Sequence, residues 1–239
     1  MIRNILIISF LIGAMFFSIL SLKPRGASAA NGPIVVELFT SQGCSSCPPA
    51  DQVINQFTEN PNLITLSYHV TYWDHLNWKD TLGRKFADQR QRSYSNYKQS
   101  NRVYTPQMII NGDKEFVGSR KNEVKKNLEE AKALAQISIS DLTPNAAKLS
   151  LPAIENGDYY LWVAGVKTKH VEKIGRGENR NKTVTYSNIV LSLEHGARWD
   201  GHAKTINIAL NETPEIDHYV VFAQNKAYGE IIAAGKINI

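Results

Sequence analysis

Residues 35–51 have the sequence VVELFTSQGCSSCPPAD, an apolar run followed by two cysteines and two prolines. The run predicts a buried strand, which Gly43 ends. Cys44 and Cys47 are the only cysteines in the chain, so a disulfide within the molecule must join them. The loop-entropy expression gives so short a ring only about 2 kcal/mol of stabilisation, against about 4.7 kcal/mol for a 100-residue loop. A chemical role therefore explains the two cysteines better than a stabilising bridge does. They would act either as a dithiol that opens and closes or as the ligands of a metal ion.

A helix is predicted directly after the cysteines. Apolar residues fall on one face of it, and Pro48 and Pro49 suit its first turn, where a backbone N–H would lack a partner. The start of a helix favours a thiolate. A strand, a C-x-x-C pair and a helix in this order are typical of thioredoxin-like proteins. We therefore expect Cys44, nearer the exposed tip of the turn, to be the nucleophile, and Cys47 to be the resolving thiol.

The first 30 residues predict an export signal. A basic start at Arg3 precedes an apolar run over 5–22, and an A-x-A cleavage motif follows at 27–29. Cleavage would leave a periplasmic or secreted protein, whereas an uncleaved segment would be a membrane anchor. The segment holds three basic residues and no acidic one, so its loss lowers the formal charge from +5 to 5 − 3 = +2. The basicity is then no argument for a nucleic-acid partner.

The rest of the chain divides by its patterns. Residues 31–136 alternate between strand and helix in the order β-α-β-α-β-β-α, with a polar helix over 80–100. Residues 137–239 instead show seven short strand-like runs separated by glycine, proline and asparagine turns. We therefore predict an α/β thioredoxin-like domain over 31–136, followed by an all-β antiparallel sandwich-like domain over 137–239.

Two further residues of the first domain suggest chemistry near the cysteines. Glu37 lies within the apolar strand, where a buried carboxyl group could exchange a proton with Cys47; an edge strand would instead leave it solvated. The Thr105–Pro106 pair precedes a strand. A cis bond there would expose the backbone of Thr105 to an extended substrate, and the alternative is an ordinary proline at a strand start.

The connection over 72–78 is rich in aromatic residues and histidine. Trp73 could line a substrate site, and His69 or His75 could serve as a base or as a soft-metal ligand beside the thiols. Packing or surface roles are the alternatives for both histidines. Basic residues of the following helix indicate a solvated face, with attraction of acidic substrates as the alternative: Arg84, Lys85, Arg90, Arg92 and Lys98.

A charged, glycine-bearing loop lies in the second domain at 174–183. It is longer than a hairpin connection requires, and long loops on rigid scaffolds often carry binding residues. We expect it to bring Arg176 or Glu178 near Cys44, where an arginine could hold an acidic substrate. The alternative is a surface loop that points away from the cysteines.

The chain resembles a family of uncharacterised secreted bacterial proteins within the thioredoxin-like superfamily. The resemblance is carried by VELFTSQGCSSCPPAD (36–51), YHVTYWD (68–74), WKD (78–80), VYTPQMIING (103–112) and RGEN (176–179). It implies a cis Pro106 facing the cysteines and an acidic residue before the first cysteine, where Glu37 stands. The chain departs from thioredoxins in having no aromatic residue before Cys44, a Ser-Ser pair between the cysteines and an insertion over 71–101.

Together these features predict an exported thiol–disulfide oxidoreductase that uses the Cys44–Cys47 dithiol or disulfide and no other cofactor. Its partners would be protein or small-molecule thiols and disulfides. The first alternative is an envelope metal-binding module that carries Cu(I) on Cys44, Cys47 and His69 or His75. The second is a recognition protein whose all-β half carries the function. Neither the substrate nor the direction of electron flow follows from the sequence.

Overall fold

A computed structural model describes residues 32–211 and 213–239; the expected signal peptide over 1–30 lies outside the described residues. The helices of this part of the chain are α1 (Pro48–Asn55), α2 (Lys85–Tyr97) and α3 (Lys121–Glu130). None of them is long and apolar enough to cross a membrane. The strands are β1 (Ile34–Thr40), β2 (Leu63–His69), β3 (Gln107–Ile110), β4 (Lys114–Val117), β5 (Ala135–Gln136), β6 (Ser138–Thr143), β7 (Ala146–Leu151), β8 (Tyr159–Lys173), β9 (Thr183–Trp199), β10 (Lys204–Ala209), β11 (His218–Asn225) and β12 (Ile231–Asn238).

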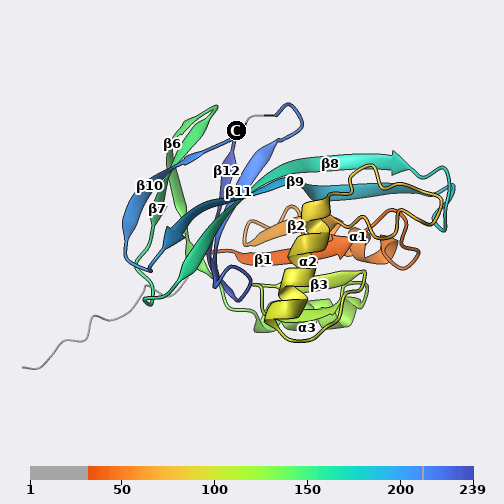
Figure 1. Cartoon of the computed structure of the whole chain (residues 1–239), viewed down its shortest axis with the longest axis horizontal. Helices are drawn as coiled ribbons and strands as arrows, with labels where there is room; N and C mark the ends of the chain where they lie inside the picture. The colour runs from red at the N-terminus through yellow and green to blue at the C-terminus, as the bar shows by residue number, and fades with distance from the viewer. Residues whose placement is uncertain (1–31, 212) are drawn as a thin grey trace, which may run out of the picture.

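One mixed sheet of nine strands organises the molecule, in the order β4-β3-β1-β2-β9-β8-β11-β12-β5 (Figure 1). β1 runs parallel to β2 and antiparallel to β3, which in turn pairs with β4 in the antiparallel direction. On the other side of β2, β9 joins in the parallel direction at the pair Ser67 and Ile189, and the Ser67 hydroxyl donates to the backbone oxygen of Ser187 at 2.8 Å. β6, β7 and β10 form a separate three-stranded sheet.

The predicted fold class is therefore wrong. The elements follow each other in the predicted order, but the protein is mostly β, and the expected α/β domain and sandwich do not form separate sheets. Four of the seven strands expected in the sandwich extend the first sheet instead, and they lie beyond its β2 edge. The reason is the length of β8 and β9, which have 15 and 17 residues and are long enough to lie along β2 and still carry the small sheet beyond it.

Both faces of β1 are covered, which explains its nearly continuous apolar sequence. Val35 and Phe39 pack in one cluster with Tyr94 of α2, while Val36 and Leu38 pack on the opposite face with α1 and α3. Figure 1 shows α2 lying across the strands on one face of the sheet. Packing thus fixes the positions of β1 and α1, and the site lies at the junction between them.

α2 begins at Lys85, five residues later than predicted, because Asp80 holds the preceding segment in a turn. Its two carboxylate oxygens accept hydrogen bonds from the backbone nitrogens of Gln42 and Leu82, at 2.8 and 2.9 Å. These hydrogen bonds hold residues 80–82 next to the end of β1, so this segment does not form part of the helix. They also bring the 71–84 segment next to the cysteines.

Candidate functional site

Cys44 and Cys47 form a disulfide with their Cα atoms 5.4 Å apart. Cys47 is the N-cap of α1, and Pro48 and Pro49 occupy the first turn as predicted. The turn before the helix is closed by backbone bonds from Cys44 N–H to Ser41 and from Cys47 N–H to Cys44, each of 3.2 Å. The two sulfur atoms are therefore presented at the point where the strand ends and the helix begins.

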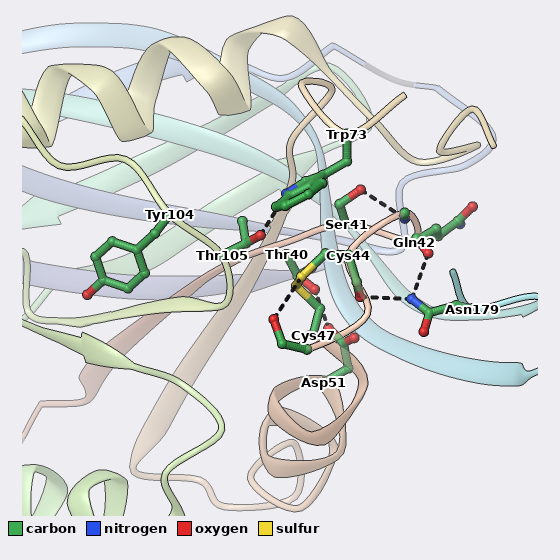
Figure 2. Close-up of a disulfide and its surroundings, with 12 residues drawn as sticks. Thr40, Ser41, Gln42, Cys44, Cys47, Asp51, Trp73, Tyr104, Thr105 and Asn179 are labelled. Carbon is green, nitrogen blue, oxygen red and sulfur yellow. Dashed lines mark hydrogen bonds between the residues drawn. A yellow bond between two sulfur atoms is a disulfide. The ribbon is translucent and has the colours of Figure 1, made fainter. Parts of the chain in front are cut away.

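The disulfide is covered, so the prediction that Cys44 lies at an exposed tip is wrong. Cys44 is 1% exposed and Cys47 is fully buried. Trp73 lies over the turn, and its indole nitrogen donates to Thr105 Oγ1 at 2.8 Å (Figure 2). A Cβ atom on Gly43 would stand only 3.1 Å from Trp73 Cβ, so glycine is what lets the indole segment approach this closely. The insertion over 71–101 supplies this cover, which the cysteine motif alone does not indicate.

Ser45 and Ser46, between the cysteines, are exposed. The Ser46 hydroxyl oxygen lies 3.4 Å from Cys44 Sγ. The hydroxyl group is therefore placed to donate to a Cys44 thiolate if the disulfide opens.

The Thr105–Pro106 peptide bond is cis, as predicted. Pro106 is buried, and its carbonyl oxygen accepts a hydrogen bond from the backbone of Gly118 at 3.0 Å. The hydroxyl oxygen of Thr105 accepts the hydrogen bond from the Trp73 indole nitrogen. The substrate-binding roles of Thr105 and Trp73 stay predictions.

The loop between β8 and β9 reaches the cysteines, but through a residue that the sequence analysis missed. Asn179 is 1% exposed, and its amide nitrogen donates to the backbone oxygens of Gln42 and Cys44, at 2.9 and 2.8 Å (Figure 2). Arg176 and Glu178 are exposed and line a surface hollow, together with Leu76, Asn77 and Arg180. Their predicted roles stay predictions. The RGEN motif lies in this loop, but the prediction was based on its charged residues, Arg176 and Glu178, and not on Asn179.

A buried polar group lies under the disulfide. Asp51 of α1 is 3% exposed and accepts a 2.7 Å hydrogen bond from Thr40 at the end of β1. His69, at the end of β2, is 1% exposed, and its Nδ1 lies 2.9 Å from the Asp80 carboxylate. The other carboxylate oxygen of Asp51 and the Nε2 of His69 have no hydrogen-bond partner among the described residues. Tyr186 of β9 packs edge-on against His69 at 4.7 Å between ring centroids.

The two buried carboxyl groups differ in acidity. Burial raises the pKa of Asp51 from 3.8 to about 7, against the opposing attraction of His69 and the hydrogen bond from Thr40. Burial also acts to raise the pKa of Asp80, but the attraction of His69 and the hydrogen bonds from His69, Gln42 and Leu82 hold that pKa below its usual value. Asp80 is thus a fixed anion at neutral pH, whereas Asp51 changes its charge there.

Glu37 is buried, as predicted, but its partners lie in α2. Its carboxylate lies 2.6 Å from the Nε of Arg90 and accepts a hydrogen bond from the Tyr94 hydroxyl group. Arg90 is 1% exposed, so its expected place on a solvated helix face is wrong; the solvated-face pattern could not show that one of five basic residues turns inward. Among the described residues no hydrogen bond joins Glu37 to either cysteine, and its exchange of a proton with Cys47 stays a prediction.

Within residues 32–211 and 213–239, no group of three or more His, Cys, Asp and Glu side chains is arranged to hold a metal ion. His69 is committed to Asp80, while the exposed His75 lies 2.9 Å through Nδ1 from the backbone oxygen of Tyr72. The metal-binding alternative therefore gains no support from the described part of the chain.

Fold and site together define a protein with a C-x-x-C disulfide at a strand–helix junction of a large mixed sheet, closed over by a tryptophan and by the tip of a long hairpin. The chain belongs to the family described as "Protein of unknown function (DUF1223)", whose model matches residues 35–224.

Solved structures that are similar to it include the following two. The crystal structure of protein AGR_C_4864 from Agrobacterium tumefaciens is 29% identical, covers 89% of this chain and 96% of its own, and has a TM-score of 0.75. HBP35 of Porphyromonas gingivalis is 16% identical, covers 90% of this chain and 77% of its own, and has a TM-score of 0.57, which is a likeness of fold alone. No curated protein matches the chain.

Proposed function

We propose that this protein is an exported thiol–disulfide oxidoreductase whose working group is the Cys44–Cys47 disulfide. The observation that carries the proposal is the disulfide itself, which joins the only two cysteines of the chain across a three-residue separation at the N-terminus of α1. So short a ring contributes only about 2 kcal/mol through loop entropy. A redox role therefore explains the two cysteines at the start of α1 better than a stabilising role does.

The surroundings of the cysteines support reversible opening. The positive end of the α1 dipole, with Cys47 as the N-cap, favours a thiolate at Cys44 or Cys47. The Ser46 hydroxyl lies 3.4 Å from Cys44 Sγ and would add a donor to that thiolate. We keep kinship with thioredoxin-like proteins as part of the proposal, and it rests on this local arrangement rather than on the overall architecture.

The proposed reaction is exchange through a mixed disulfide. A substrate thiolate attacks Cys44 Sγ, the Cys44–Cys47 bond breaks, and Cys47 leaves as a thiolate that takes up a proton. A second substrate thiolate then attacks the substrate sulfur of the mixed disulfide and releases Cys44. The substrate dithiol loses two electrons and the protein disulfide gains them, and the reverse sequence reduces a substrate disulfide. Partners would be protein or small-molecule thiols and disulfides outside the cytoplasm.

The test uses the mature chain in glutathione redox buffers. The fraction of free thiol, measured by alkylation and mass spectrometry, should change reversibly with a single midpoint potential. Cys47→Ala should accumulate a mixed disulfide with glutathione at Cys44, and a Cys44→Ala, Cys47→Ala double variant should capture none. The proposal fails if the wild-type pair cannot be cycled and neither the Cys47→Ala nor the Cys44→Ala single variant captures a thiol.

A further inference from the structure

We infer that Asp51 is the acid–base residue of this disulfide: it gives a proton to Cys47 when the bond opens and takes it back when the bond closes. The inference rests on the proposed function and adds to it a residue that the cysteine motif does not indicate. Asp51 lies one helical turn after Cys47, and its backbone nitrogen donates to the Cys47 carbonyl at 3.1 Å. Residues four apart on a helix share a face, so the two side chains are neighbours.

The position of the Asp51 carboxyl group fits this task. One oxygen is fixed by Thr40 at 2.7 Å, and the other is buried without a hydrogen-bond partner among the described residues. Figure 2 shows Asp51 beneath Cys47, with Thr40 on the strand beside it. A buried carboxyl oxygen without a partner is costly, and such groups in native structures call for an explanation. The exchange of a proton with the neighbouring Cys47 sulfur would explain why this Asp51 oxygen has no partner.

Charged and titratable groups face Asp51 from each element around it. They are Cys47 in α1, His69 in β2, Asp80 in the 71–84 segment and Tyr186 in β9, while Thr40 in β1 is a neutral partner. β9 packs directly against α1, since Asn55 donates to the backbone oxygen of Thr185 at 2.9 Å. Asp80 is already paired with His69, so it leaves Asp51 as the carboxyl group free to change its charge. The Asp51 pKa, which burial raises to about 7, gives it both protonation states near neutral pH.

An attacking thiolate bonds to Cys44 Sγ, the sulfur–sulfur electron pair moves to Cys47 Sγ, and the proton of the Asp51 carboxyl group passes to that sulfur. The products are a mixed disulfide at Cys44, a neutral Cys47 thiol and an Asp51 carboxylate. Protonation of the leaving thiolate matters because Cys47 is fully buried, where an unpaired anion is costly.

The test follows the rate at which dithiothreitol reduces the disulfide between pH 5.5 and 8.5, normalised to the concentration of dithiothreitol thiolate. In the wild type this rate should fall as pH rises through about 7, the pKa of Asp51. Asp51→Asn should lower the rate at pH 6 by about 100-fold, the usual scale of general acid catalysis, and should lose the titration. Glu59→Gln, the same chemical change at an exposed position beyond α1, should keep the wild-type profile.

Thr40→Val gives a second reading that does not depend on how well Asp51→Asn folds. Because the Thr40 hydrogen bond lowers the Asp51 pKa, its loss should move the midpoint of the rate profile to higher pH. The inference is overturned if Asp51→Asn retains the wild-type profile or if the Thr40→Val midpoint does not move. A wild-type disulfide that no thiol reduces would instead defeat the proposed function, so the two failures are distinguishable.

Discussion

The indole nitrogen of Trp73 and the hydroxyl oxygen of Thr105 are 2.8 Å apart, and this hydrogen bond closes the chain over the Cys44–Cys47 disulfide (Figure 2). The two residues come from different segments, the 71–84 connection and the approach to β3. The bond therefore ties one side of the site to the other. With Cys44 only 1% exposed, any thiol reagent must displace this cover before it can reach the sulfur.

Weakening this bond should make the disulfide more reactive. A neutral hydrogen bond contributes about 1 kcal/mol, so Thr105→Val should raise the population of the open site, and the rate of reduction by dithiothreitol, about fivefold. Thr143→Val makes the same substitution at an exposed position in the three-stranded sheet and should leave the rate unchanged. Equal rates for wild type and Thr105→Val would show that the cover does not limit access.

Asn179 should matter for stability far more than the charged residues beside it. Its amide group pairs with the buried carbonyl oxygens of Gln42 and Cys44. Asn179→Ala would leave both without that donor, at a cost of about 1–3 kcal/mol in the free energy of unfolding measured with urea. Glu178→Ala, at the exposed position before it, should cost less than about 0.5 kcal/mol. Similar losses for the two variants would contradict the role given to Asn179.

The buried ion pair of Glu37 and Arg90 gives a third prediction. Removing one partner leaves the other charge buried, so Arg90→Met should lower the free energy of unfolding by about 3–5 kcal/mol. Glu37→Leu combined with Arg90→Met removes both charges and should be less destabilising than the sum of the single changes. Arg92→Met, at an exposed position on the same helix, is the matched control. Additive losses in the double variant would mean that the pair is not coupled.

The sequence was most informative where the structure is local. The strand of residues 34–40 and the helix after Cys47 depend on periodicity and on the glycine and prolines beside them, and the structure contains both. The joining of β2 to β9 depends on which strand edge meets which, 120 residues apart, and no local pattern encodes that choice. For the same reason the sequence does not indicate Asn179, because only the folded chain brings it to the cysteines. Asp51 stands four residues after Cys47 in the sequence, but its burial appears only in the folded chain. Arg90 was misplaced because its burial needs Glu37, which lies on another element.

His218 should make the protein less stable in acid. Burial, together with Lys236 on the neighbouring strand and against the pull of Asp217, lowers the pKa of His218 from 6.5 to about 4. Between these values the unfolded chain binds the proton and the folded chain does not, so stability falls as pH drops from about 6.5 to about 4. The loss is on the order of 3 kcal/mol, and His218→Gln should remove it in urea unfolding experiments. A variant with the same acid sensitivity as the wild type would rule His218 out as its source.

Asp51 should give the opposite slope. Its pKa is raised from 3.8 to about 7, so between these values the folded protein holds a proton that the unfolded chain has lost. Stability contributed by the neutral carboxyl group is therefore fully present below about pH 4, falls as pH rises to about 7, and is constant above that. The difference is on the order of 4 kcal/mol.

Urea unfolding of the oxidised protein at pH 4.5 and pH 8 should show the Asp51 loss partly offset by the opposite His218 effect, so the comparison is best made in the His218→Gln background. There, Asp51→Asn should flatten the dependence and be the more stable protein at pH 8, while Glu59→Gln should follow the parent. A parent whose stability does not fall between these pH values, or an Asp51→Asn variant that falls just as steeply, would show that Asp51 is not buried as a proton-exchanging acid.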